Sequence, residues 1–230
     1  MLRLSLRGYA TAAAALAITI TLAGGCSTTP TAVPYVATPV GTTWTGQHTN
    51  SGSFGSGTSL VTMRAGERMW EGQRVLTHES ASGVMLTRVA DGLRIGFLGP
   101  DGKPQFLLSP PIGPQFPLAP GKAWTDNTMM TLFPSGTAIP VESEWRVHDF
   151  EDVTVPAGTF KAWKLSWKDS TGESETRWIS PAQGIATVKR HVERTASHPQ
   201  GPGVLDAELI CEHLERLQPQ PDVGALPVVE

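Results

Sequence analysis

The chain has 230 residues, among them 24 Gly and 19 Pro, with 40% hydrophobic residues, 17% charged residues and a net charge of −3 at pH 7. This hydrophobic content is too high for a disordered chain, and the weak negative charge gives no electrostatic reason to expect nucleic-acid binding. Two cysteines exclude a disulfide-dense scaffold and a four-cysteine zinc site. The composition predicts one globular domain that is rich in turns.

The first 25 residues have the features of a signal peptide. Two arginines precede an apolar run at residues 10–23, which is shorter than the roughly 20 residues that cross a bilayer. The segment LAGGC at residues 22–26 resembles the lipobox of bacterial lipoproteins, in which the cysteine is acylated and becomes the new N-terminus. An ordinary secretory signal with an incidental cysteine is the alternative interpretation.

The lipobox resemblance implies that the protein is held in the cell envelope by a lipid on Cys26. Several acyl chains anchor a protein stably, whereas one chain does so only marginally, and the processed cysteine of such lipoproteins carries three. Because Ser27 is not Asp, the resemblance also implies the outer membrane facing the periplasm if the host is Gram-negative.

Composition divides the chain into four parts. Residues 1–25 are the predicted lipoprotein signal peptide, which is removed, and residues 26–40 are the acylated Cys followed by a flexible tether rich in Ser, Thr and Pro. Residues 41–217 are predicted to form a single β-rich domain. Residues 218–230 contain several prolines and are predicted to be a disordered tail.

Alternation of apolar and polar residues predicts strands throughout the domain. The clearest case is a segment in which Trp163, Leu165 and Trp167 alternate with polar residues. About ten strands are expected, near residues 42–49, 58–69, 73–79, 83–90, 93–98, 104–108, 123–133, 137–150, 160–169 and 174–180. Two less regular strands are expected at residues 185–194 and 204–215, although residues 204–217 also fit one short helix.

These strands are separated by turn residues at the spacing of an antiparallel meander. The predicted fold is therefore all-β, a curved antiparallel meander sheet or an open half-barrel. Residues 109–122 contain five prolines; a loop of this length is expected to cover an end of the sheet or to border a site.

Three motifs occur in order within residues 118–190: PGKAW at 120–124, VPAGTF at 155–160 and WISPAQGI at 178–185. They are similar to the corresponding segments of a broad group of uncharacterised bacterial envelope proteins, distantly reminiscent of the open half-barrels of lipoprotein carriers. The resemblance implies an architecture. Because the motifs contain turn and core residues with no acid, base or nucleophile, it implies no catalytic mechanism.

No set of residues has the spacing of a known catalytic or metal-binding motif. His191, His198 and His213 would converge if the last two strands pair, but three surface histidines unrelated to a metal are the preferred interpretation. Acidic residues at 142–152 are interpreted as a solvated sheet edge rather than a paired acid and base. Cys211 is expected to be buried, because it shares one face of a strand with Leu209. We therefore expect no catalytic residues, no metal ligands and no cofactor.

Seven tryptophans are the most unusual feature of the composition. Most of them lie on the apolar faces of the expected strands, where they form the core of a large sheet or line a groove for a hydrophobic ligand. The candidate apolar face consists of Trp145, Trp163, Leu165, Trp167 and Trp178.

The sequence favours a lipid-anchored envelope lipoprotein that acts without catalysis, as a binding or scaffolding module. Its expected partners are the membrane, through the N-terminal anchor, and a hydrophobic small molecule or another envelope protein, with no nucleic acid. One alternative is a hydrolase of a cell-wall or lipid ester substrate, in which folding brings a His together with a Ser or an acid. The other alternative is a purely structural envelope lipoprotein.

Overall fold

The computed structural model describes residues 32–181 and 186–214. The predicted signal peptide, Cys26 and the predicted tail at residues 218–230 lie outside the described residues. All regular elements of the described part are β-strands. Within this part there is no helix with the length and hydropathy needed to span a membrane.

Twelve strands follow one another along the chain, and the all-β prediction is confirmed. Each expected stretch contains a strand, and the segment for which a short helix was the alternative is a strand as far as residue 214. The strands are β1 (Thr42–Gly52), β2 (Gly57–Trp70), β3 (Gln73–Ser80), β4 (Gly83–Arg88), β5 (Arg94–Leu98), β6 (Pro104–Ile112), β7 (Ala123–Leu132), β8 (Thr137–Val155), β9 (Gly158–Asp169), β10 (Glu173–Ser180), β11 (Ala186–Arg194) and β12 (Gly203–Leu214).

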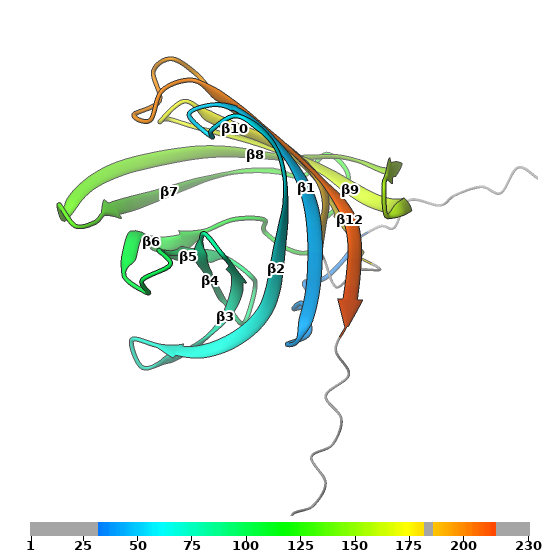
Figure 1. The fold of residues 1–230 in the computed structure, drawn as a ribbon, viewed down its shortest axis with the longest axis horizontal. Helices are drawn as coiled ribbons and strands as arrows, with labels where there is room; N and C mark the ends of the chain where they lie inside the picture. Colours follow the sequence, from blue (N-terminus) through cyan, green and yellow to red (C-terminus); the bar gives the residue numbers. More distant parts are fainter. Residues whose placement is uncertain (1–31, 182–185, 215–230) are drawn as a thin grey trace, which may run out of the picture.

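The strands form a closed antiparallel barrel rather than an open half-barrel. Each strand pairs with its neighbours in sequence, and β1 also pairs with β12. This closing pair runs from Thr42 opposite Leu214 to Gly52 opposite Gly203, and Figure 1 shows the two strands side by side. Closure satisfies the backbone groups that the first and last strands of an open sheet would leave unpaired.

The acidic residues of β8 lie on two different parts of the strand. Glu144 lies where β8 pairs with both β7 and β9, and its carboxylate pairs with Lys168 at 3.1 Å. Pairing with β7 ends at Arg146, so residues 149–152 have a strand partner on the β9 side only, and there the carboxylate of Asp152 pairs with Lys161 at 3.0 Å. The interpretation as a sheet edge therefore holds for residues 149–152, whereas Glu142 and Glu144 lie on the wall of the barrel.

Strand alternation separates a buried interior from the outer wall. On β8, every second residue from Val141 to Val147 is buried, and the residues between them are exposed or half-buried. One of the core clusters lies where β8, β9 and β10 curve past a loop. It consists of Leu118, Val147, Trp163, Leu165 and Ile179.

A β-bulge reverses the facing of the last residues of β12. Leu209 pairs with Gly46 and Cys211 pairs with the preceding Thr45, so Ile210 is the additional residue of the bulge. Leu209 is buried, whereas Cys211 is exposed. The expectation that Cys211 is buried was wrong, because a one-residue insertion changes the face of every residue that follows.

The chain before β1 crosses one end of the barrel. We call residues 33–38 the strap and residues 113–122 the Pro loop. The backbone N–H of Val33 donates to the carbonyl of Leu118 at 2.9 Å, and the N–H of Leu118 donates to the carbonyl of Val33 at 2.8 Å. The ring of Tyr35 lies 5.4 Å from that of Phe116. The strap and the Pro loop therefore cover the barrel end at which both Thr42 and Leu214 lie.

Candidate functional site

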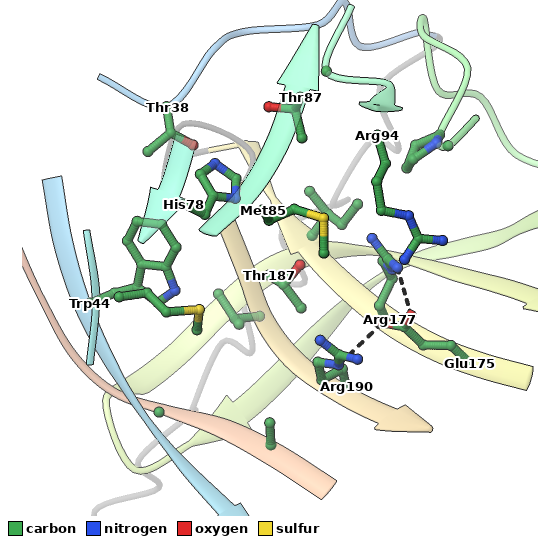
Figure 2. Close-up of a pocket in the computed structure, with 18 of the residues that line it drawn as sticks. Thr38, Trp44, His78, Met85, Thr87, Arg94, Glu175, Arg177, Thr187 and Arg190 are labelled. Atoms are coloured by element: carbon green, nitrogen blue, oxygen red, sulfur yellow. Dashed lines mark hydrogen bonds and ion pairs between the residues drawn. The ribbon is translucent and has the colours of Figure 1, made fainter. Parts of the chain in front are cut away.

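The barrel encloses a cavity with a volume of about 410 Å³. Its wall consists of side chains from the strands on opposite sides of the barrel, and the strap and the Pro loop contribute to it at the covered end. Figure 2 shows side chains from these strands converging on this space. The volume lies within the roughly 300–1,000 Å³ of typical small-molecule sites.

One side of the cavity is apolar. It includes Trp44 from β1, Met63 from β2, Met85 from β4 and Phe97 from β5. Trp44 is buried and meets the imidazole of His78 edge to face, with ring centroids 5.3 Å apart. Thioether and aromatic side chains of this kind adapt to apolar ligands of varied shape.

Gly46 leaves space in this wall. It lies between Trp44 and His48 on β1 and lines the cavity. A Cβ at this position would lie 3.4 Å from Nε2 of His48 and 3.5 Å from the backbone oxygen of Glu208, which is ordinary contact. A side chain larger than Ala would therefore extend into the cavity.

The opposite side of the cavity carries a cluster of charges around Glu175. This residue lies on β10 and is 4% exposed. One of its carboxylate oxygens accepts hydrogen bonds from Nη2 of Arg177 at 2.6 Å and from the indole N–H of Trp167 at 3.0 Å. The other oxygen lies 3.4 Å from Nε of Arg190. Figure 2 shows both arginines directed at this carboxylate.

The surroundings of Glu175 keep its carboxylate ionised. Burial acts to raise its pKa, but the positive charges of Arg177 and Arg190 and the hydrogen bonds from Arg177 and Trp167 outweigh burial. The resulting pKa of Glu175 is about 2, against an ordinary value of 4.5. At neutral pH the residue is therefore a fixed negative charge inside the barrel.

Arg94 on β5 completes this side of the cavity. Its guanidinium lies over the ring of Trp167 at 5.9 Å, and that of Arg177 lies over the ring of Trp145 at 5.8 Å. The two tryptophans are stacked, with ring centroids 5.4 Å apart. Stacking on aromatic faces fixes the planes of the two guanidinium groups while leaving their N–H edges available.

Two histidines of the cavity wall are neutral at pH 7. Burial lowers the pKa of His78 below its ordinary value of 6.5. Burial also lowers the pKa of His48, and the positive charge of Arg190 adds to this effect. The charge of the wall at neutral pH therefore comes from its arginines and carboxylates.

The structure divides the five residues of the candidate apolar face into three groups. Trp163 and Leu165 are fully buried beneath Leu118 of the Pro loop and belong to the core. Trp145 and Trp167 are buried beside the charge cluster. Trp178 is half-buried and packs against a different core cluster, which includes Ala162 and Val188, while its indole N–H donates to Glu151 at 2.7 Å.

Sequence reasoning missed Glu175, Arg177, Arg190 and Arg94, which carry the charge of the cavity. A signal for two of them was present on β10, because Glu175 and Arg177 share the strand face of the buried Ile179. Charged residues at inward positions are rare unless they are paired or functional. Arg190 on β11 lies opposite Arg177 in the β10–β11 pair, so its place depends on the register of that pair, whereas the contribution of Arg94 on β5 depends on the curvature of the whole barrel.

Two histidines outside the cavity form close polar pairs, but the two pairs do not join into one Ser–His–Asp arrangement among the described residues. Nε2 of His148 lies 2.7 Å from the hydroxyl of Ser166, and Nδ1 of His191 lies 2.7 Å from the carboxylate of Asp206. Both pairs lie on the outer wall. Ser166 and His191 both face Thr176 of the intervening strand, so they are about 10 Å apart, beyond the reach needed for proton transfer.

The three histidines considered as metal ligands do not converge. His191 is bound to Asp206, and Nε2 of His198 lies 3.9 Å from a carboxylate oxygen of Glu173. Across residues 32–181 and 186–214, no group of three or more His, Cys, Asp or Glu residues is arranged to hold a metal ion.

Solved structures that match this chain do so with low similarity, as three examples show. An exported protein with a YmcC-like fold from Bacteroides fragilis matches with a TM-score of 0.43 and 13% identity, covering 79% of this chain and 99% of its own. A protein assigned as a lipoprotein from Parabacteroides distasonis matches with a TM-score of 0.37 and 8% identity, covering 79% of this chain and 99% of its own. The hypothetical lipoprotein YmcC from Escherichia coli matches with a TM-score of 0.37 and 10% identity, covering 77% of this chain and 84% of its own.

These three proteins are described as exported proteins or lipoproteins. At 8–13% identity and with TM-scores below 0.5, the likenesses carry no information on ligand or activity. No protein-family model matches the chain, and no curated protein sequence matches it.

Proposed function

We propose that the protein is a lipid-anchored envelope protein that binds a small amphiphilic molecule inside its barrel and does not catalyse a reaction. The observation that carries this proposal is the cavity of about 410 Å³. Close-packed interiors contain few voids larger than a water molecule, so a space of this size in a barrel interior is typical of a ligand site.

The lining of the cavity favours an amphiphile over a purely apolar ligand. The side formed by Trp44, Met63 and Met85 offers burial to a hydrocarbon segment, whereas Arg177 and Arg190 lie on the other side. A purely apolar molecule that covered the arginines would remove water from charged groups without replacing its hydrogen bonds, which is costly. A ligand with one apolar and one polar part matches both sides.

The hydroxyl groups of the cavity support a binding function without catalysis. Ser80 and Ser82 line the cavity, but the hydroxyl of Ser80 lies 2.9 Å from that of Ser82 and bonds the carbonyl of Gly83. Neither serine has a histidine as a hydrogen-bond partner among the described residues. A nucleophile activated by an adjacent base is the minimum requirement of a serine hydrolase.

The predicted anchor would place the covered end of the barrel towards the membrane. Only residues 27–31 separate Cys26 from the described chain, and such a segment spans at most about 20 Å. The strap then joins the Pro loop at the barrel end. A lipid on Cys26 would therefore hold this end close to the bilayer from which an amphiphile would enter or leave.

Replacing Cys26 tests the anchor. We expect Cys26→Ser to move the protein from the membrane fraction to the soluble fraction, because the acyl chains that hold it in the bilayer cannot be attached. Fractionation followed by immunoblotting measures the distribution. The matched control is Cys211→Ser, which removes the exposed cysteine of β12 and should leave the protein in the membrane. Retention of Cys26→Ser in the membrane would contradict a lipid anchor at this residue.

Filling the cavity tests the binding site. We expect Gly46→Leu to weaken the binding of dodecanoate by about tenfold or more, because the added side chain extends into the space that the ligand occupies. Isothermal titration calorimetry of the full chain carrying Cys26→Ser measures the affinity. Gln47→Leu adds the same side chain to the adjacent exposed position and should bind as the parent does. Equal affinities for Gly46→Leu and its parent would place the ligand outside the cavity.

A further inference from the structure

We propose that Arg94, Arg177 and Arg190 form a binding site for the acidic head group of the amphiphile, a carboxylate or a phosphate attached to its hydrocarbon part. This proposal rests on the proposed function, because it specifies the chemistry of a ligand in the same cavity. Its basis is an uncompensated positive charge, a set of unused hydrogen-bond donors and their position next to the apolar wall.

The charge cluster carries more positive than negative charge. Glu175 is the carboxylate that Arg177 and Arg190 share, and Arg94, which lies over Trp167 on the same side of the cavity, is near enough to interact with its charge. Three guanidinium groups therefore surround one carboxylate, an excess of two positive charges. A charge in a site of low dielectric strongly favours a partner of opposite sign.

The other carboxylates of the wall do not remove this excess. Glu173 accepts a hydrogen bond from Nε of Arg194 at 2.7 Å, and Glu208 accepts one from Nζ of Lys189 at 2.7 Å. Both therefore have cations of their own outside the cluster. The histidines do not change the balance either, since the pKa values of His48 and His78 are lowered.

Two of the arginines have buried N–H groups that no protein atom uses. Nε of Arg177 and Nε of Arg190 are buried and have no hydrogen-bond partner. The 3.4 Å separation between Nε of Arg190 and Glu175 is close enough for an ion pair but lacks hydrogen-bond geometry. Buried donors are normally satisfied, and an unsatisfied donor costs about 1–3 kcal/mol, so these groups indicate a partner that enters the cavity.

Among the three arginines, Arg94 has the guanidinium with the fewest protein partners in the described part of the chain. Within the described part of the chain, its guanidinium contacts the face of Trp167 and forms no hydrogen bond or ion pair. Burial is the main cause that lowers the pKa of Arg94, and the nearby positive charge of Arg177 lowers it further. The guanidinium nevertheless stays protonated, as arginine does in proteins. A planar fork of N–H groups held against an aromatic ring matches the two oxygens of a carboxylate or phosphate.

The arginines lie next to the apolar wall rather than apart from it. Figure 2 shows Met85 between His78 and the guanidinium of Arg94, with Trp44 beyond His78. A hydrocarbon chain attached to an anion bound by Arg94 can therefore extend past Met85 towards Trp44. A free anion would use only the charged side of the cavity and leave the apolar side empty.

Binding measurements with ligands that share one chain test this proposal. We would titrate the full chain carrying Cys26→Ser with dodecanoate, dodecyl phosphate and dodecanol, and with acetate and inorganic phosphate as head groups without a chain. We expect the two acidic amphiphiles to bind about tenfold or more tightly than dodecanol, the size of effect that a charge-assisted hydrogen bond supplies. Acetate and inorganic phosphate should bind more weakly than either acidic amphiphile.

Arg94→Gln separates the head-group site from the rest of the cavity. Because Arg94 does not bond Glu175, its replacement leaves the ion pairs of the cluster in place. We expect Arg94→Gln to lower the affinity for dodecanoate and dodecyl phosphate by about tenfold and to leave that for dodecanol unchanged. The matched control, Arg146→Gln, removes one positive charge from an exposed position on β8 and should alter neither.

The possible results distinguish this proposal from the proposed function. The acidic head-group site is contradicted if dodecanol binds as tightly as dodecanoate. It is also contradicted if the affinities of Arg94→Gln for dodecanoate and dodecyl phosphate equal those of its parent. In either case the amphiphile cavity stands. If inorganic phosphate binds as tightly as dodecyl phosphate, the site accepts a free anion and the amphiphile is contradicted. If none of the compounds binds, both proposals fail.

Discussion

Glu175→Gln is expected to lower the free energy of unfolding at pH 7 by roughly 3–5 kcal/mol, the usual cost of removing one partner from a buried ion pair. The carboxylate of Glu175 is almost fully buried and is the shared partner of Arg177 and Arg190. A neutral amide would leave three guanidinium groups close together without the carboxylate that lies among them. Chemical denaturation of the variant and its parent measures the difference.

The same substitution should change the acid dependence of stability. The folded-state pKa of Glu175 is about 2, below the ordinary 4.5, so its contribution is present above about pH 4.5 and is lost as the pH falls towards 2. The difference between the two values corresponds to about 3 kcal/mol. The parent protein should therefore lose stability in this range, and Glu175→Gln should show a flatter profile.

The control for this prediction is a carboxylate on the outer wall. Glu144 forms an ion pair with Lys168, and both side chains are about two-thirds exposed. Glu144→Gln should change the unfolding free energy by less than about 1 kcal/mol, because exposed ion pairs contribute little. If both variants were equally stable at pH 7, the charge cluster would not be the buried network described above.

Trp163→Ala is expected to reduce stability by about 3–5 kcal/mol, the usual cost of truncating a buried aromatic side chain to Ala. The indole of Trp163 is fully buried, packs against the ring of Phe150 at 4.9 Å and lies in one cluster with Leu118 of the Pro loop. Its removal should also increase hydrogen exchange at the Leu118 amide, because the Pro loop would lose the surface on which it packs.

Trp178→Ala provides a matched comparison, since it truncates the same kind of side chain on the neighbouring strand, at the margin of a different core cluster. Trp178 is half-buried and bonds Glu151, so we expect a cost of about 1–2 kcal/mol and unchanged exchange at Leu118. Equal effects of the two truncations would contradict the difference between a fully buried Trp163 and a half-buried Trp178 at the margin of the core.

The strands of this fold were predictable because each one has a local signal. Alternation in segments such as that around Leu165, together with turn residues between segments, located all twelve strands to within a few residues. Closure was not predictable in this way. The pairing of Thr42 with Leu214 joins opposite ends of the domain, and neither strand contains a residue pattern that specifies its partner.

The binding site was less predictable than the fold. Trp145 and Trp167 were found because tryptophans on a strand face are conspicuous. Their neighbours were missed because Arg190 depends on the register of β11 against β10, and Arg94 comes from β5, which is distant from β10 both in the chain and in the order of the strands. The exposure of Cys211 was missed for a related reason, because the bulge at Ile210 arises from pairing with β1 and has no local signature.

The central claim is that the barrel holds an amphiphilic molecule, and native mass spectrometry tests it most directly. The full chain would be purified from an envelope extract, together with the Gly46→Leu and Gln47→Leu variants. We expect an additional mass, beyond the protein and its covalent acyl groups, that organic solvent removes and that Gly46→Leu lacks but Gln47→Leu retains. A bare protein mass, or an additional mass that is equally present in Gly46→Leu, would contradict a ligand in the cavity.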